Sequence, residues 1–428
     1  MFRFISEKQH SNHRWLGLSR LVGLICRECG TEHGHVLAHV CPECFGALEA
    51  TYDYENIELD RNKIEMRMPT MWRYRELLPI TDDDCIVNLG AGFTPLTRSD
   101  KLARRIGVRR LYIKNDTLNP TYSFKDRPAS VAISKAREFG VRIVGCASTG
   151  NLASATAAHA AAAGLKCVVF MPISVEEEKI KQASIYGADI ILLNGTYDDV
   201  NRVAALAADR YGLGVVNVNL RPYYVEGSKT MGLEIIEQLG WRLPDRIIVP
   251  TASGALLSAI YKGIEEAERI GLIKESSVTM TCAQPLGCSP IVEAFKKNLD
   301  EVPPVRSPST IVQSLAIGDP GDGYRVLRVV RKTCGVCEAV TDDEALEAVK
   351  MLASDAGIFA EPGGAISVAV LRRLVDQGVV GRDEEVVCCV TGSGLKTIDV
   401  TPIPQNIHKA EAKFDSVSTI LSCVAAAS

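Results

Sequence analysis

Short β-branched segments alternate with alanine-rich helical segments from about residue 108 onward, and this alternation restricts the possible folds more than any other feature. Strands are predicted at residues 110–114, 142–146, 166–171, 189–193, 245–250, 278–283 and 385–390. Helices are predicted at residues 152–163, 197–210, 227–239 and 254–270. Because strands that are separated by helices usually pair in parallel, the pattern predicts an α/β fold with open, mostly parallel sheets.

A chain of 428 residues exceeds the length at which one hydrophobic core usually keeps growing, so several domains are expected. We predict an irregular segment at 1–22, a small module at 23–55, an α/β core at 56–405 and a tail at 406–428. The core is expected to contain a smaller α/β subdomain at about 128–225 and a larger one formed by the remainder. Ligands of such sheets bind at the carboxyl ends of strands, so the expected site is the cleft between the two subdomains.

The charge balance excludes a large positive field, since 48 basic side chains stand against 52 acidic ones and the net charge is −4. This balance disfavours nucleic acid and an anionic membrane as partners. The N-terminus lacks the apolar core of a signal peptide, and no segment approaches the roughly 20 apolar residues of a spanning helix. The sequence therefore predicts a soluble cytoplasmic protein, in which Cys388 and Cys389 are buried free thiols.

Two Cys-x2-Cys pairs lie eleven residues apart in the 23–55 module and give the strongest metal signal of the chain. The candidate ligands are Cys26, Cys29, Cys41 and Cys44. Four thiolates predict a structural Zn²⁺ that supplies folding energy to a zinc-ribbon-like module, and the alternatives are unmetallated or iron-loaded cysteines. Three histidines between the pairs are expected to be loop residues: His33, His35 and His39. The separate pair Cys334 and Cys337 is expected to be two core thiols.

Lys125 lies in the sequence Ser-Phe-Lys-Asp-Arg, which suits a lysine that forms a Schiff base. Such a lysine must be neutral part of the time, and desolvation and a neighbouring cation promote this by lowering its pKa. Phe124 can shield the amine, and Arg127 is the expected cation. The turn at 119–121 can present the segment at a helix start. The alternative is a solvated helix face, which most Lys-Asp-Arg triplets form.

Three loops of small residues follow predicted strands and suit the other parts of a pyridoxal-phosphate pocket. One loop can direct backbone N–H groups and a helix dipole at a phosphate, and it consists of Thr251, Ala252, Ser253, Gly254 and Ala255. Asn151 can bond a ring oxygen through its amide, although as a plain helix N-cap it would need no ligand. Thr391 or Ser393 can meet the pyridine nitrogen with a hydroxyl, which is a neutral contact.

In these motifs and their order the chain resembles the threonine synthases, within the tryptophan-synthase-β-like (fold type II) pyridoxal-phosphate enzyme family. The resemblance extends from about residue 85 to 400. The matching motifs are residues 92–96, 119–121, 123–127, 148–151, 226–230, 361–362 and 391–396. An N-terminal zinc-ribbon-like segment also occurs in some members of the family.

The resemblance implies a role for each candidate residue. Lys125 would form the Schiff base, and Asn151 would meet the ring oxygen. Residues 251–255 would cradle the cofactor phosphate, and Thr391 would meet the ring nitrogen. The substrate carboxylate would lie near a helix start formed by Ser148, Thr149 and Gly150. The implied activity is that of a lyase that converts O-phospho-L-homoserine and water to L-threonine and phosphate, with Lys125 moving protons at Cα and Cβ.

Several positions on the presumed substrate side depart from the family pattern. Tyr122 stands where members usually have Gly, and Leu152 replaces a Thr that helps to hold the substrate. Tyr224 stands where members often have an Arg that faces the substrate phosphate. The nearby Arg221 is expected to compensate as a substrate-binding residue. Because loss of a charge-assisted contact costs on the order of 2 kcal/mol, these departures are the pattern expected of a changed substrate.

Two classes of alternative function follow. A cysteate-synthase-like enzyme, which replaces the phosphate of O-phosphoserine with sulfite, is the nearest, and a threonine or serine dehydratase comes next. The non-enzyme alternative is a regulatory protein that binds the cofactor or an amino acid, and the intact Lys125 and Asn151 argue against it. Pyridoxal-phosphate enzymes of this fold commonly form dimers, so a homodimer is a further expectation.

Overall fold

The computed structural model describes residues 19–148, 150–175, 177–274, 277–401 and 407–426. The chain forms two compact units that divide between Lys396 and Thr397. The candidate Thr149 and most of the predicted segment at 1–22 lie outside the described residues. In the second unit, the predicted tail contains helix α13 (Phe414–Ala426).

Thirteen strands and thirteen α-helices are present in the described residues. The helices of the first unit are α1 (Arg61–Glu65), α2 (Asp100–Ile106), α3 (Asp126–Glu138), α4 (Asn151–Ala162), α5 (Glu177–Ser184), α6 (Tyr197–Tyr211), α7 (Arg221–Gln238), α8 (Ala255–Arg269), α9 (Pro290–Lys296), α10 (Gly323–Lys332), α11 (Asp342–Ala356) and α12 (Pro362–Asp376). Among these helices, none is both long and apolar enough to cross a membrane.

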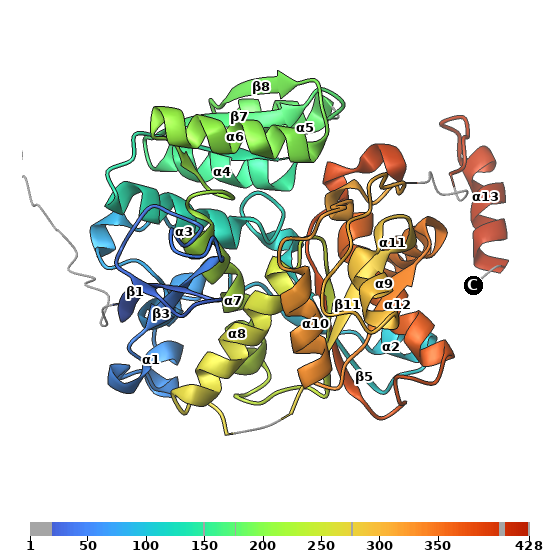
Figure 1. Cartoon of the computed structure of the whole chain (residues 1–428). Coiled ribbons are helices and arrows are strands. Elements are labelled where there is room, and N and C mark those ends of the chain that lie inside the picture. The colour runs from blue at the N-terminus through green and yellow to red at the C-terminus, as the bar shows by residue number, and fades with distance from the viewer. Residues whose placement is uncertain (1–18, 149, 176, 275–276, 402–406, 427–428) are drawn as a thin grey trace, which may run out of the picture. The chain divides into compact units, whose positions relative to one another are not determined.

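The larger sheet of the first unit has six strands in the order β12-β11-β10-β13-β5-β4. Figure 1 labels two of them, β5 and β11. Its strands are β4 (Leu96–Arg98), β5 (Arg110–Asn115), β10 (Arg246–Pro250), β11 (Thr279–Pro285), β12 (Cys337–Val340) and β13 (Glu385–Val390). All neighbours pair in parallel except β4 and β5. The α/β class and the mostly parallel pairing are therefore confirmed.

Helices cover both faces of this sheet. Alternate apolar residues of its central strands point to opposite faces, so each face needs a covering layer. Ile247 and Val249 of β10 join a core with apolar residues of α7 and α8. Ile248, between them, joins a second core with residues of α11 and α12. Cys388 and Cys389 of β13 divide between the same two cores, and both are buried free thiols as predicted.

A second, fully parallel sheet has four strands in the order β8-β7-β6-β9. Its strands are β6 (Ile143–Ala147), β7 (Lys166–Pro172), β8 (Asp189–Leu193) and β9 (Gly214–Val215). Helix α4 packs on one face, through a core that includes Val144, and α6 packs on the other, through a core that includes Phe170. All four strands fall within the range 128–225 that the sequence suggests for a subdomain.

A small antiparallel sheet precedes these two, with the order β2-β1-β3. Its strands are β1 (Leu21–Cys26), β2 (Glu32–His33) and β3 (Leu48–Tyr52), and they lie in the region of the predicted 23–55 module.

Two expectations were wrong. The helix predicted at 227–239 begins at Arg221, because Pro222 occupies its first turn, where a missing N–H group carries no cost. Cys334 is exposed in a left-handed turn with φ of 49°, whereas Cys337 is buried on β12. Only Cys337 of that pair is a core thiol.

Candidate active site

Backbone hydrogen bonds join three distant segments around Lys125. The Phe124 N–H donates to the Thr391 carbonyl at 2.8 Å, and the Ser393 N–H donates to the Tyr122 carbonyl at 3.0 Å. The Glu361 N–H donates to the Gly392 carbonyl at 2.9 Å. Three of the sequence motifs therefore meet in one place, although they are spread over about 270 residues of chain.

Glycine is required where the Thr391 loop passes Glu361. A Cβ on Gly392 would overlap the carboxylate of Glu361, and a Cβ on Gly364 would lie 3.0 Å from the Thr391 amide nitrogen. The close approach explains the Thr-Gly-x-Gly pattern of this loop in steric terms. It also keeps the buried Thr391 beside the segment that carries Lys125.

Lys125 occupies the N-cap position of α3 and is half-buried. Its Nζ lies 3.1 Å from the Tyr224 hydroxyl oxygen, to which it donates, and 4.7 Å from the centre of the Phe124 ring. Burial lowers the pKa of Lys125 to about 8, and the positive charge of Arg221 adds to this effect. The amine is therefore neutral in a useful fraction of molecules near neutral pH, as a nucleophilic lysine requires.

Arg127 is not the cation that acts on Lys125, which corrects the sequence-based expectation. Its Nε lies 2.6 Å from Asp116 Oδ2, and its Nη2 lies 2.7 Å from Glu234 Oε2, with all three side chains fully buried. On a helix, residues two apart point to different sides, so Arg127 turns into the core. A Cβ on Gly227 would overlap the Arg127 carbonyl, which shows how tightly α3 and α7 pack there.

The start of α4 brings Asn151 to Glu361. The Asn151 amide donates to both carboxylate oxygens of Glu361, at 3.0 and 3.1 Å. Asn151 is the first helical residue and Gly150 is the N-cap, so Asn151 is not a plain N-cap. Ser148 Oγ accepts from the N–H groups of Gly150 and Ala153, at 3.0 and 3.1 Å, and orders the turn.

The predicted phosphate cradle, Thr251–Ala255, lies between β10 and α8. In the described structure, no side chain caps the start of α8, so its first N–H groups and its dipole are available to an anion. Gly254 is left-handed, with φ of 95°, and a Cβ there would lie 2.8 Å from the Asp322 carbonyl oxygen. The Thr251 hydroxyl donates to the Val249 carbonyl at 2.8 Å, and its backbone N–H donates to the Ala283 carbonyl at 2.9 Å, so both donors of this residue are engaged within the protein.

Arg221 and Tyr224 lie one turn apart at the start of α7. The guanidinium of Arg221 pairs with Asp322, and the Arg221 side chain as a whole is about one-third exposed. Tyr224 is buried, and burial raises the pKa of its hydroxyl, so this group is protonated when it contacts Lys125. The departure from the family pattern therefore places a neutral hydroxyl at the lysine and leaves Arg221 as a cation in the same region.

Two residues of this region were not proposed from the sequence. Lys396 follows the Thr391 loop, and its buried Nζ has no hydrogen-bond partner among the described residues. Burial lowers the pKa of Lys396 to about 8, while Glu361 and Asp126 act in the opposite direction. Asp322 lies in a Gly-Asp-rich loop with no recognisable motif, and only the folded chain brings it to Arg221.

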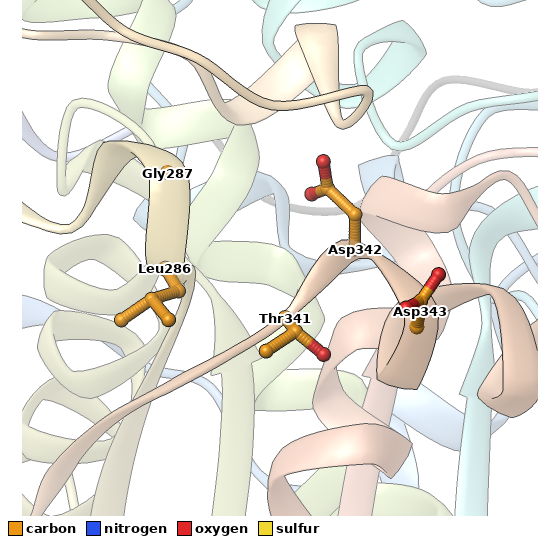
Figure 2. A pocket seen from close by; sticks show the side chains of 5 residues that line it. All are labelled: Leu286, Gly287, Thr341, Asp342 and Asp343. Atoms are coloured by element: carbon orange, nitrogen blue, oxygen red, sulfur yellow. The ribbon is translucent and has the colours of Figure 1, made fainter.

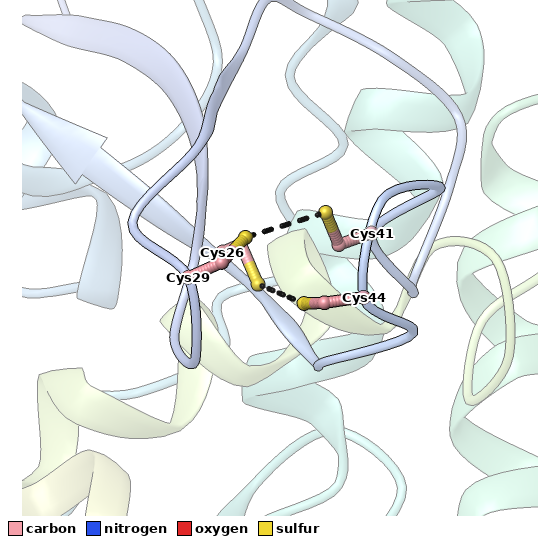
Figure 3. Close-up of side chains that lie close together, drawn as sticks. All are labelled: Cys26, Cys29, Cys41 and Cys44. Atoms are coloured by element: carbon pink, nitrogen blue, oxygen red, sulfur yellow. Dashed lines mark hydrogen bonds between the residues drawn. The ribbon is translucent and has the colours of Figure 1, made fainter.

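The four-cysteine cluster has the geometry of a tetrahedral metal site (Figure 3). The Sγ atoms of Cys26 and Cys44 are 3.4 Å apart, those of Cys29 and Cys41 are 3.8 Å apart, and all four lie within 4.8 Å of one another. Zn–S bonds of about 2.3 Å in a tetrahedron separate the sulfurs by about 3.8 Å, so the residues fit Zn²⁺. None of the three nearby histidines belongs to the cluster in the described chain.

A separate hollow of about 370 Å³ lies at the carboxyl ends of β11 and β12 (Figure 2). It is lined by Leu286, Gly287, Thr341, Asp342 and Asp343. Thr341 caps α11, and the Asp342 carboxylate accepts hydrogen bonds from Thr310 and Ile311. These polar groups have structural partners, and none of the candidate site residues lines the hollow.

Two mostly parallel sheets, a lysine with a lowered pKa and an uncapped helix start that follows a glycine are the features of an α/β enzyme that binds a phosphate-bearing carbonyl cofactor. The sequence model of the family described as "Pyridoxal-phosphate dependent enzyme" matches residues 87–392. The chain belongs to this family, and it is a pyridoxal-phosphate-dependent enzyme, as the sequence predicts.

Two relatives with at least 40% sequence identity to this chain are both named threonine synthase. The threonine synthase of Methanocaldococcus jannaschii is 42% identical over 87% of this chain and 93% of that protein. The threonine synthase of Methanosarcina acetivorans is 40% identical over 92% of this chain and 97% of that protein.

Solved structures establish the same fold at lower identity. A fungal L-serine ammonia-lyase from Rhizomucor miehei matches with a TM-score of 0.61 at 21% identity, over 72% of this chain and 96% of that one. Threonine deaminase isoform 2 from Solanum lycopersicum matches with a TM-score of 0.60 at 20% identity, over 78% of this chain and 83% of that one.

Proposed function

We propose that this protein converts O-phospho-L-homoserine and water to L-threonine and phosphate. The observation that carries the proposal is its identity of 40–42% with two threonine synthases over most of each chain. The class of substrate follows, a small amino acid with a phosphate ester. The lysine with a lowered pKa and the nearby Arg221 support this substrate class, because one can move protons and the other can attract a phosphate.

In this proposal, each candidate residue has a separate role in binding the cofactor or in moving protons. When bound, pyridoxal phosphate stores the electron pairs released as protons leave Cα and Cβ of the substrate. Lys125 binds the cofactor and, once free, removes and returns those protons. The loop at 251–255 holds the cofactor phosphate, Asn151 contacts the ring oxygen, and Thr391 contacts the ring nitrogen.

On the substrate side, the helix start at 148–150 holds the carboxylate, and Arg221 attracts the phosphate that leaves. Tyr224 orients the amine of Lys125 through the contact of 3.1 Å. We further propose one structural Zn²⁺ on the cysteine cluster, a cytoplasmic location and a homodimer.

The test is product formation by the purified, cofactor-loaded protein. Given O-phospho-L-homoserine, we expect equal amounts of phosphate and L-threonine, and no product from Lys125→Ala. O-phosphoserine with sulfite, and threonine or serine alone, are supplied in parallel. Product from one of these substrates, and none from O-phospho-L-homoserine, would reject the proposed substrate while keeping the cofactor assignment.

A further inference from the structure

Asp322 connects three functional parts of the first unit although it lies in none of the sequence motifs. Its backbone N–H donates to the Ser253 carbonyl of the 251–255 loop at 2.9 Å. Its carboxylate accepts from Arg27 Nη1 on Oδ1, at 3.1 Å, and from Arg221 on Oδ2. Only 5% of the side chain is exposed, so these contacts are shielded from water.

The cysteine module supplies the first of these arginines. Arg27 lies between Cys26 and Cys29, inside the first Cys-x2-Cys pair, and its own N–H donates to the Ala47 carbonyl at 3.0 Å. Its Nε lies 2.7 Å from Glu49 Oε2 on β3, at the opposite side of the guanidinium from Asp322. Two carboxylates and the metal-binding turn therefore fix the direction of Arg27.

Arg221 has a different environment. Its side chain is 31% exposed, whereas those of Arg27 and Asp322 are 13% and 5% exposed. Arg221 is thus the most exposed member of this group, and its charge acts on Lys125 in the candidate active site. A free arginine loses side-chain entropy when it is ordered, so a pre-placed guanidinium binds an anion more tightly than a mobile one.

We propose that Asp322 is a positioning residue that holds Arg221 ready for the anionic group of the substrate, and that the cysteine module supports it through Arg27. The inference rests on the proposed function only in taking the substrate to be a phosphate ester. The cysteine module then contributes to substrate recognition as well as to folding.

The direction in which anion affinity changes when Asp322 is removed distinguishes positioning of Arg221 from simple neutralisation of its charge. If Asp322 only cancelled the charge of Arg221, its removal would make the site more positive and would strengthen anion binding. If Asp322 positions Arg221, its removal lets the side chain turn into solvent, and anion binding weakens. Asp322→Asn keeps the size of the side chain and removes its charge, so it distinguishes the two.

The experiment titrates inorganic phosphate into the cofactor-loaded protein by calorimetry. We expect the Kd of phosphate to rise about tenfold in Asp322→Asn, as for loss of one charge-assisted contact, and severalfold in Arg27→Gln. The matched control is Arg325→Gln, because the Arg325 side chain pairs with Glu49, while its contact with Asp322 is a backbone hydrogen bond that the substitution keeps. The Kd of phosphate for this control should stay within about twofold. KM for O-phospho-L-homoserine should rise with the phosphate Kd, while kcat changes less.

Thermal melts and the affinity for pyridoxal phosphate check that each variant is folded. If Asp322→Asn does not fold, the Kd of phosphate for Arg27→Gln tests the inference by itself. Unchanged or tighter phosphate binding in the folded variants, or no phosphate binding by the unmutated protein, overturns the inference. If the unmutated protein makes no threonine, but Asp322→Asn and Arg27→Gln still bind phosphate more weakly than the unmutated protein and the control, the proposed function fails and the inference stands.

Discussion

Lys125 illustrates how the properties of one residue depend on distant parts of the chain. The neighbouring Phe124 shields it as the sequence predicts, but its cation is Arg221 and its hydrogen-bond partner is Tyr224, both almost 100 residues away. The sequence-based choice of Arg127 failed because helix geometry turns that residue into the core. Local motifs could identify the reactive lysine, whereas the groups that set its pKa depend on packing between α3 and α7.

The lowered pKa of Lys125 predicts the pH dependence of cofactor capture. Only the neutral amine attacks the aldehyde of pyridoxal phosphate, so the rate in the cofactor-free protein should rise with pH and level off above about 8, rather than near 10.5. Arg221→Gln removes a positive charge, raises the pKa of Lys125 and should move the plateau to higher pH. Stopped-flow absorbance measures the rate. The exposed Arg202 provides the control Arg202→Gln, which should leave the profile unchanged. An unshifted profile in Arg221→Gln would show that burial alone lowers the pKa of Lys125.

Tyr224→Phe tests the contact at the amine. Without the hydroxyl, Lys125 loses its side-chain hydrogen bond to Tyr224 and becomes less well oriented for proton transfer, so we expect kcat to fall about tenfold with little change in KM. Steady-state kinetics with O-phospho-L-homoserine measures both constants. A rise in KM with unchanged kcat would instead place Tyr224 on the substrate.

At the scale of whole elements, two helix starts depend on glycine. Gly150 precedes α4 with φ of 151°, where a Cβ would lie 2.8 Å from Lys179 Cδ, and Gly254 precedes α8. Helix and strand positions were largely predictable, because β-branched runs and alanine-rich runs are local signals. Periodicity predicts the start of α7 at residue 227, six residues after its position at Arg221, where Pro222 occupies the first turn.

Gly254→Ala should damage the phosphate cradle. The added Cβ meets the Asp322 carbonyl oxygen at 2.8 Å in a left-handed residue, so we expect a loss of about 1–3 kcal/mol in the free energy of unfolding and at least tenfold weaker binding of pyridoxal phosphate. Denaturant unfolding and cofactor titration measure the two effects. Gly240→Ala is the control, since Gly240 is also left-handed but a Cβ there meets nothing within 4 Å. Equal cofactor affinity in both variants would argue against the cradle.

At the scale of the whole first unit, the cysteine module is tied to the α/β core by partly buried ion pairs. Glu49 of β3 pairs with Arg27, Arg325 and Lys262, and Lys262 pairs in turn with Glu226 of α7. The sequence could identify the cysteine ligands from spacing alone, because both pairs are local. It could not reveal these ion pairs, because their partners lie up to 276 residues apart.

Metal content should control the stability of this module. We expect one Zn²⁺ per chain, and its removal by a chelator should lower the thermal midpoint and expose residues 23–55 to proteolysis, since this module has little core of its own. Metal analysis and limited proteolysis measure these effects. Cys29→Ser should lose the metal, whereas Cys334→Ser, which changes an exposed cysteine outside the cluster, should keep it. A metal-free protein that resists proteolysis would show that the cysteines are not a metal site.

The position of β13 has a consequence for synthesis on the ribosome. This strand is the last of the larger sheet to be translated, yet it lies between β10 and β5 and pairs with both. The loop that follows it accepts the hydrogen bond from Phe124 beside Lys125. A nascent chain can complete its smaller sheet early, but it must leave a gap in the larger one until β13 has emerged, so cofactor capture follows the translation of every strand of the larger sheet.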